Sequence, residues 1–310
     1  MGQVIVIAGP TCSGKTNLAI RVAERINSEI ISADSRQVYK YLNIGTAKPS
    51  KAELKKVKHH LIDHTSPDGI FNAGMFVDEA ERIISRLHLE NKIPVVAGGT
   101  GLYIKSLIDG IINSVDTNME LRDELLRKRK QFGNEFLYNE LKRVDPKSAD
   151  SMLPQNWKRV IRALEVFYIS GKPIWWHFDE QIKNSDNYFF QFGIDWDRTI
   201  LYERIEKRVD IMIENGLVYE VTELINKGYS KQINSLNTVG YKEIISYLEN
   251  EISLMRAVEL IKRNTRRYAK RQITWFKADN RIDWINVKSE ADILEASNFI
   301  IKKVLNERKN

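Results

Sequence analysis

The sequence has little of what marks secreted, membrane-spanning or metal-scaffolded proteins. Cys12 is its only cysteine, so no internal disulfide can form, and we expect no structural metal site. No segment approaches the roughly 18 uncharged apolar residues that a membrane-spanning helix needs. An apolar run begins almost at Met1, with no basic leader or cleavage site before it. We therefore expect a cytoplasmic protein without a membrane partner, and we take a monomer as the expected state.

Negative charge is scarcer than positive charge. The 310 residues include 48 Lys or Arg and 41 Asp or Glu, so the net charge is +7. Residues 256–277 carry eight basic residues against Glu259 alone, and residues 48–58 carry five lysines against Glu53. Such patches are typical of surfaces that meet a phosphate backbone. The first segment also has amphipathic spacing, so it predicts either a helix that binds such a backbone or a solvated helix.

Strands and helices alternate over the first hundred residues. Apolar runs that predict buried strands lie at 4–8, 29–33, 60–62 and 93–97, and again at 188–195 and 282–287. Helical spacing lies between them, at 15–26, at 73–90 and after residue 101. This alternation predicts an α/β fold with a doubly wound parallel sheet.

The middle of the chain differs from its two ends. Strand-like runs vanish there, and helical patterns dominate at 119–132, 135–143 and 156–170. We therefore expect a catalytic core made of residues 1–115 and 186–310, with a helical insertion domain at 116–185.

A phosphate-binding motif follows the first predicted strand. The pattern G-x-x-x-x-G-K-T stands between a strand and a helix, the context in which it forms a P-loop. Its glycines let backbone amides converge, and the helix N-terminus adds positive potential. Lys15 supplies a mobile cation, and the Thr16 hydroxyl can bind Mg²⁺. The residues expected to hold phosphate are Gly9, Pro10, Thr11, Cys12, Ser13, Gly14, Lys15 and Thr16.

The acid that most P-loop NTPases use to hold Mg²⁺ is missing from its usual place. The apolar strand at 93–97 ends in Gly98-Gly99-Thr100, without a carboxylate. Asp34 instead follows the strand at 29–33. It is a metal ligand of an ordinary kinase, a general base at the carboxyl edge of the sheet, or a cap of the next turn. The Gly-Gly-Thr turn either lets a ligand approach the backbone beside Thr100 or is purely structural.

Two arginines stand on the helix expected from about residue 199. Arg204 and Arg208 are four residues apart, so both leave one face of that helix. They either clamp a diphosphate from the side opposite the P-loop or pair with Glu203 and Glu206.

Two other groups of polar residues are less specific. Lys158, Arg159 and Arg162 form a basic face on an insertion helix, which taken alone is more typical of a solvated surface. His59, His60 and His64 have no matching cysteines or carboxylates, so we predict no metal site there.

Together these motifs identify a family. The chain closely resembles the bacterial tRNA dimethylallyltransferases, also called tRNA isopentenyltransferases, whose members transfer a dimethylallyl group from its diphosphate to N6 of the adenine 3′-adjacent to the tRNA anticodon. The matching stretches are GPTCSGKT (9–16), DSRQVYKYLNIGTAKP (34–49), HHLIDH (59–64), GGTGLY (98–103), RALEVF (162–167), GYKE (240–243) and TRRYAKRQITWF (265–276).

The resemblance implies roles for the residues already singled out. Lys15, Thr16, Mg²⁺ and Arg208 would neutralise the diphosphate leaving group, Asp34 would be the general base, and Thr100 would contact the reacting groups. Dimethylallyl diphosphate and the tRNA anticodon stem-loop are the implied partners. The implied tRNA contacts are Asp34, Ser35, Arg36, Gln37, Thr100, Arg122, Lys158, Arg159, Val160, Ile161 and Arg162.

The sequence departs from the family pattern near one insertion helix, and it leaves other functions open. Gln155-Asn156-Trp157 stands where the family commonly has an Asn-Asp pair, which puts the local cap in question. One alternative function is prenylation of free adenine nucleotides, which needs no helical insertion. Another, from a different class, is a P-loop small-molecule kinase that transfers the γ-phosphate of ATP.

Overall fold

The chain folds into two compact units. The computed structural model describes residues 2–111, 115, 117–180 and 187–307. One unit joins Met1–Ile108 to Ser185–Asn310, and the other is Asp109–Asn184. The boundaries expected at 116 and 185 both fall on residues outside the described ranges. Among the described residues, no helix is both long enough and apolar enough to cross a membrane.

The first unit is built on a parallel sheet. Its strands are β1 (Gly2–Ala8), β2 (Ile30–Ser32), β3 (His59–His60), β4 (Val95–Gly98), β5 (Asn187–Trp196) and β6 (Asp283–Val287). They lie in the order β3-β2-β4-β1-β5-β6, and each neighbouring pair is parallel. The prediction of a parallel sheet is therefore confirmed.

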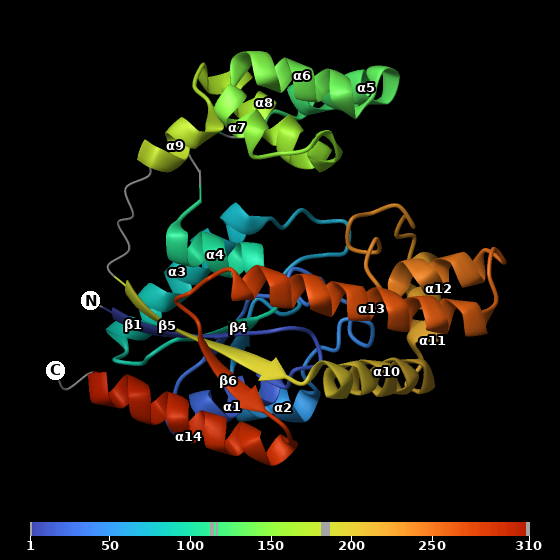
Figure 1. Cartoon of the computed structure of the whole chain (residues 1–310). Helices are drawn as coiled ribbons and strands as arrows, with labels where there is room; N and C mark the ends of the chain where they lie inside the picture. Colours follow the sequence, from blue (N-terminus) through green and yellow to red (C-terminus); the bar gives the residue numbers. More distant parts are fainter. Residues whose placement is uncertain (1, 112–114, 116, 181–186, 308–310) are drawn as a thin grey trace. The chain divides into compact units, whose positions relative to one another are not determined.

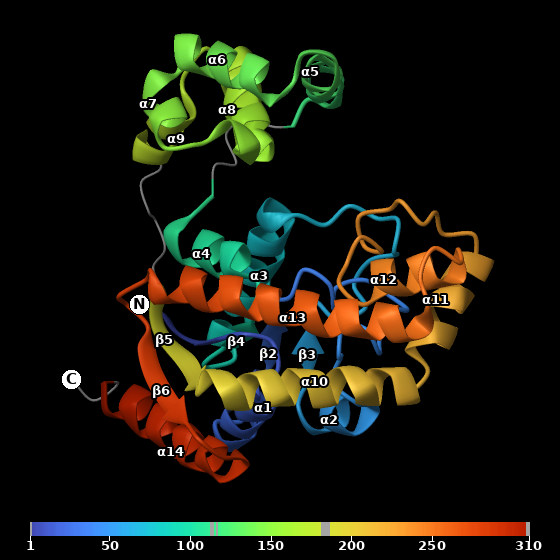
Figure 2. The same ribbon diagram turned by 45° about the vertical axis from the view of Figure 1, so that its right-hand side comes forward.

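Helices cover both faces of this sheet, as a doubly wound fold requires. Figures 1 and 2 show α1 and α14 on one face, and α3, α4 and α13 on the other. The helices of this unit are α1 (Lys15–Arg25), α2 (Lys51–Lys56), α3 (Ala73–Leu89), α4 (Gly101–Asp109), α10 (Arg198–Glu214), α11 (Leu217–Asn226), α12 (Tyr241–Leu248), α13 (Leu254–Lys277) and α14 (Glu290–Glu307).

Alternation along the central strands decides which side chains meet which helices. Ile5 and Ile7 of β1 are fully buried and share one hydrophobic cluster with Leu18 of α1 and Ile293 of α14. Phe192 of β5 joins the same cluster. Burying such side chains contributes about 1.5–3 kcal/mol each, so this layer supplies much of the stability of the core.

The sheet order brings three loops to one edge. The P-loop follows β1, Asp34 follows β2, and Gly99 follows β4, and these three strands are neighbours. A side chain at Gly98 would place its Cβ 2.1 Å from the carbonyl oxygen of Ala33. Only glycine therefore lets the ends of β4 and β2 approach so closely, and the edge becomes the natural place for a ligand.

A charged cluster at the start of β2, the end away from Asp34, joins this strand to β3 and α3. Glu29 is hydrogen-bonded to Nε2 of His60 on β3 at 2.6 Å and forms an ion pair with Arg86 of α3. Burial acts to raise the pKa of Glu29, but the hydrogen bonds from His60 and Arg86 outweigh it and lower that pKa to about 2. His60 is thus a structural residue. No cluster of metal-ligating side chains occurs in the part of the chain that the structure describes.

The second unit is entirely helical in its described residues. Its helices are α5 (Met119–Phe132), α6 (Asn134–Val144), α7 (Pro146–Asp150), a 3₁₀ turn (Pro154–Asn156), α8 (Trp157–Ser170) and α9 (Ile174–Glu180). The side chain of Asn118 caps α5, and Asp145 followed by Pro146 starts α7. Leu125, Leu137 and Leu164 meet in a separate small core. The helices predicted for this segment are therefore confirmed.

Candidate active site

The three loops at the sheet edge open into one large cavity. Its volume is about 1200 Å³, and all of its lining residues belong to the first unit. It is walled by the P-loop, the loops at 34–37 and 43–49, the segment 237–242, and faces of α10 and α13. The structure thus brings together most of the predicted site: Thr11, Cys12, Ser13, Gly14, Lys15, Thr16, Asp34, Ser35, Arg36, Gln37 and Arg208.

The P-loop takes the backbone form that its sequence predicts. Cys12 and Gly14 have positive φ angles of 65° and 86°, which wrap the loop around the start of α1. No side chain caps α1, and its first backbone bond runs from Leu18 to Gly14. The amides of the first turn are therefore free of helical partners, and the helix dipole adds to their attraction for an anion.

Three distant side chains hold this loop in place. Trp196 Nε1 donates to the carbonyl of Ser13 at 2.9 Å, and Arg204 Nε donates to the carbonyl of Cys12 at 2.9 Å. Gln272 accepts from the amide of Thr11 at 2.8 Å and donates to the carbonyl of Gly99 at 2.8 Å. Sequence reasoning missed Gln272. Its only signal is a polar residue at a buried position of an otherwise strongly basic helix.

Only some of the cations around the cavity are available to a ligand. Arg204 is committed to the protein, because it also pairs with Glu290 at 2.6 Å and stacks on Trp196. Of the two alternatives for these arginines, pairing within the protein describes Arg204, although its partner is Glu290 rather than Glu203 or Glu206. Arg208 lines the same cavity and has no hydrogen bond or ion pair among the described residues.

Of the two lysines beside the cavity, Lys48 is committed to the protein and Lys15 is available to a ligand. Lys48 donates to the Tyr39 carbonyl, to Asn43 Oδ1 and to Asp63 Oδ1, which uses all three of its N–H groups. Within the described ranges, Lys15 donates only to the carbonyl of Pro10, at 2.6 Å. The pKa of Lys15 is lowered to about 8, because burial outweighs the opposing charge of Asp34 and the nearby Arg208 also acts to lower it.

Asp34 has a structural role and one free oxygen. Its Oδ1 accepts hydrogen bonds from the amides of Arg36 at 2.8 Å and Gln37 at 3.3 Å, so the turn-cap alternative describes this atom correctly. Its Oδ2 has no partner within the described ranges. Thr100 Oγ1 accepts from the amide of Ser35 at 2.9 Å, which holds the same turn from the side of β4. A carboxylate fixed through one oxygen leaves the other to face a substrate.

Two predicted tRNA contacts beside Asp34 bond mainly within the protein. Arg36 donates to the carbonyl of Asn234 at 2.8 Å. The side-chain amide of Gln37 donates to the carbonyls of Thr46 and Ala47, each at 3.2 Å, and accepts from Ser32. These bonds link the turn at 34–37 to Asn234 and to the loop at 43–49, which is another wall of the cavity.

The residues present fit a Mg²⁺ ion that is shared with a phosphate. Thr16 lines the cavity, and its hydroxyl has no partner in the described part of the chain. Mg²⁺ usually keeps several waters and takes only one or two protein ligands when it also binds phosphates. A single hydroxyl beside free P-loop amides therefore matches this ion better than a dedicated cage of carboxylates would.

Fewer basic side chains of helix α13 are free to bind an anion than its sequence suggested. Four of its eight basic residues form ion pairs: Arg256 with Glu259, Lys262 with Asp210, Arg266 with Glu206, and Lys277 with Asp195. Three of these acids belong to α10 and β5, far away in the sequence. Among the described residues, Arg263, Arg267, Lys270 and Arg271 are exposed and have no ion pair.

The insertion unit uses four of the predicted tRNA contacts in its own packing. Val160 and Ile161 are 0% and 3% exposed and pack in its core, so their side chains face inward, and the contact predicted for the stretch 158–162 stays a prediction. Arg122 and Arg162 both bind the fully buried Glu165, each at 2.8 Å, and therefore also hold this unit together. Lys158 and Arg159 remain exposed. Asn156 stands at the start of α8 without capping it through its side chain, whose Oδ1 instead accepts from the amide of Leu153 across the preceding 3₁₀ turn.

Comparison with known proteins gives one consistent result. A family model described as IPP transferase matches residues 37–279. The tRNA dimethylallyltransferase of Acetivibrio thermocellus is 51% identical over 294 residues, which cover 94% of each chain. That of Alkaliphilus metalliredigens is 45% identical and covers 97% of each chain.

Solved structures agree with the sequence comparisons. The full-length tRNA isopentenylpyrophosphate transferase of Bacillus halodurans is 36% identical, with a TM-score of 0.74, and the match covers 100% of this chain and 99% of that one. A eukaryotic dimethylallyltransferase described as acting on tRNA is 29% identical, with a TM-score of 0.81, over 94% of this chain and 75% of that one.

Proposed function

The chain belongs to the IPP transferase family and is a tRNA prenyltransferase, and we propose that its own residues move a dimethylallyl group from dimethylallyl diphosphate to an adenine of tRNA. The acceptor in this proposal is N6 of the adenine 3′-adjacent to the anticodon. One observation carries the proposal. A P-loop with two available cations and a carboxylate with a free oxygen line the same cavity, while β4 is not followed by the acid that holds Mg²⁺ in most P-loop NTPases.

The reaction requires one bond to break and another to form. The bond between C1 of the dimethylallyl group and the diphosphate oxygen breaks, and the diphosphate leaves with the electron pair. A bond forms between C1 and N6 of adenine, and N6 loses a proton. Because the allylic cation delocalises its charge, stabilising the departing diphosphate is the main electrostatic task.

The P-loop side of the cavity supports the leaving group. The amides at the start of α1, Lys15 and Arg208 all present positive charge where the diphosphate would lie. Mg²⁺ held at Thr16 would add further charge neutralisation there. Gln272, Trp196 and Arg204 fix the loop, so these donors would be in position before the bond breaks.

The Asp34 side of the cavity supports the acceptor. Oδ2 of Asp34 would take the proton that N6 sheds, because Oδ1 is already committed to the turn. The hydroxyl of Thr100 can still donate a hydrogen bond while it accepts from Ser35. The target adenine must leave its stack to reach a carboxylate inside a cavity, and single-stranded loops allow this at low cost.

Exposed cations on each unit would hold the rest of the tRNA. Arg263, Arg267, Lys270 and Arg271 present free positive charge on α13, and Lys158 and Arg159 do so on the insertion. Such contacts position a phosphate backbone without reading its sequence.

Labelled dimethylallyl diphosphate tests the donor and the acceptor together. The protein is incubated with it and Mg²⁺, and undermodified tRNA, AMP or ATP is offered in turn. We expect label in tRNA alone. Label in AMP without label in tRNA would mean a nucleotide prenyltransferase, and consumption of ATP without any transfer would mean a kinase.

A further inference from the structure

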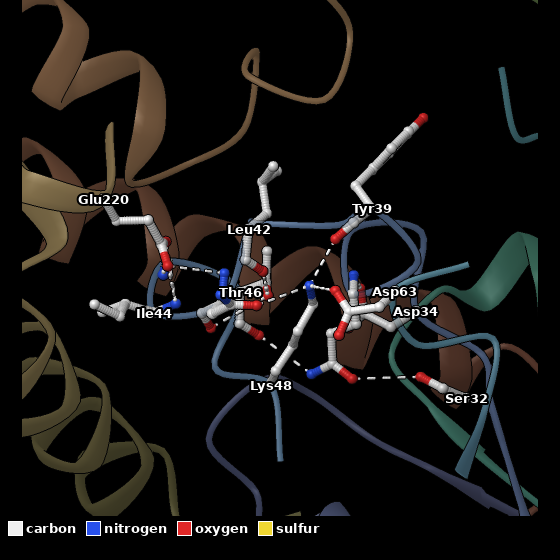
Figure 3. Close-up of polar contacts among 12 residues, drawn as sticks. Ser32, Asp34, Tyr39, Leu42, Ile44, Thr46, Lys48, Asp63 and Glu220 are labelled. Carbon is white, nitrogen blue, oxygen red and sulfur yellow. Dashed lines mark hydrogen bonds and ion pairs between the residues drawn. The ribbon is translucent and has the colours of Figure 1, made fainter. Parts of the chain in front are cut away.

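The carboxylate of Glu220 collects an unusual set of hydrogen bonds. Three consecutive backbone amides point at it: Asn43 at 2.9 Å, Ile44 at 2.8 Å and Gly45 at 3.2 Å. The hydroxyl of Tyr241 donates to the same carboxylate at 2.6 Å. Both oxygens are used, and Figure 3 shows Glu220 facing the backbone of this loop. Hydrogen bonds to a charged acceptor are about twice as strong as neutral ones, so the loop is firmly held.

Tyr241 packs against the same loop, at Gly45, and donates to Glu220. Its ring is fully buried, and a Cβ on Gly45 would lie 2.4 Å from it. Burial, together with the neighbouring carboxylate of Glu220, raises the pKa of Tyr241 well above its ordinary value, so the phenol remains a donor. The loop at 43–48 is thus held by Glu220 of α11 and by Tyr241 at the start of α12.

The other side of this loop holds the turn that carries Asp34. The carbonyls of Thr46 and Ala47 accept hydrogen bonds from the side-chain amide of Gln37. The backbone amide of Gln37 in turn donates to Asp34 Oδ1. Lys48 ties the end of the loop to Tyr39 and to Asp63 (Figure 3). An unbroken chain of hydrogen bonds and loop backbone therefore runs from Glu220 through the loop at 43–48 to the carboxylate at 34.

We propose that Glu220 is a positioning residue for the transfer reaction, which fixes the loop at 43–48 and, through Gln37, the direction of the Asp34 carboxylate. This inference rests on the proposed function. The loop and the turn both line the cavity, whereas Glu220 itself does not. Its effect on the reaction is therefore indirect.

The variant Glu220→Gln tests this role with little change in shape. Glutamine offers one acceptor oxygen, and its NH₂ group would face backbone N–H groups that now meet carboxylate oxygens. We expect kcat to fall about 10- to 100-fold, because a displacement of about 1 Å at the reacting groups costs up to about 100-fold. The KM for dimethylallyl diphosphate should stay within about twofold, since the P-loop is held by other residues.

Glu29→Gln is the matched control. It makes the same chemical change in a carboxylate that also accepts several hydrogen bonds, but Glu29 lies at the opposite end of β2 and lines no part of the cavity. Both variants should lower the melting temperature, but only Glu220→Gln should lower kcat. Tyr241→Phe removes one donor and should lower kcat by about threefold, and it replaces Glu220→Gln if that variant does not fold.

The possible outcomes separate the two claims. If the wild-type protein transfers the label, two results would overturn the positioning role alone. One is a wild-type kcat in Glu220→Gln, and the other is an equal loss of kcat in Glu220→Gln and Glu29→Gln. A wild-type protein that transfers no label to tRNA would overturn the proposed function, and the positioning role with it.

Discussion

Replacing Asp34 by asparagine separates the two tasks that the structure gives to its side chain. Asparagine keeps an Oδ1 that can accept from the amides of Arg36 and Gln37, so the turn should persist. It removes the negative charge and the basic Oδ2 that would receive the proton from N6. Asp34→Ala removes both the cap and the base, so a comparison of the two variants shows what each task contributes.

The expected sizes follow from the two roles. A positioned general base accelerates a reaction by about 10²- to 10⁴-fold, which corresponds to about 2.7–5.4 kcal/mol of activation free energy. Loss of the capping bonds costs about 0.5–2 kcal/mol of stability. We therefore expect both variants to lose about 10²- to 10⁴-fold in turnover, and only Asp34→Ala to show a lower melting temperature.

Single-turnover transfer of labelled dimethylallyl groups to tRNA measures the first effect, and filter binding measures tRNA affinity separately. Affinity should change by less than about threefold in Asp34→Asn, because the exposed cations are untouched. Turnover by Asp34→Asn within about tenfold of the wild-type rate would refute the assignment of Asp34 as the base.

Four further predictions concern charge. The KM for dimethylallyl diphosphate should rise as pH passes about 8, where the buried Lys15 loses its proton, and Lys15→Arg should remove that rise; a flat wild-type profile would contradict it. Glu29 has a folded-state pKa of about 2, below the ordinary 4.5, so it stabilises the fold above pH 4.5 and that contribution is lost as pH falls toward 2. Acid unfolding followed by circular dichroism should show that Glu29→Gln loses about 2 kcal/mol of the pH-dependent free energy of unfolding. An unchanged unfolding curve would contradict a stabilising role for the hydrogen bonds of Glu29. Neutralising Arg263 and Arg267 with glutamine should weaken tRNA binding and reduce the salt slope by roughly one per charge, and an unchanged slope would exclude them from the interface. Glu165→Ala should destabilise the insertion unit by about 3 kcal/mol, seen as faster proteolysis within residues 117–180, whereas wild-type resistance would show that its two arginine pairs matter little.

Local sequence patterns were enough to predict the sheet and the P-loop. Apolar runs such as residues 4–8 are buried on both sides of a parallel sheet, so they stand out without any knowledge of their partners. The P-loop is equally local, because its glycines, Lys15 and Thr16 are contiguous. Asp34 and Thr100 could be assigned to the same edge because both follow strands.

Interactions between distant segments could not be predicted in this way. The acids that pair with Lys262, Arg266 and Lys277 of α13 lie on α10 and β5, so the positive charge of this helix looked freer in the sequence than it is. Gln272 and Glu220 act on backbone groups of remote loops, and a backbone group leaves no mark in the sequence. Val160 was assigned to RNA by family resemblance, although its apolar side chain on an amphipathic helix already favoured the core.

The most direct test of the central claim is the identity of the atom that receives the prenyl group. Undermodified tRNA with adenine 3′-adjacent to the anticodon is compared with the same tRNA carrying guanine there, each incubated with dimethylallyl diphosphate and Mg²⁺. Nuclease digestion and mass spectrometry then locate the added group. The proposal predicts N6-dimethylallyladenosine at that position in the first tRNA and no product from the second. A prenyl group at another nucleotide, or equal transfer to both tRNAs, would contradict it.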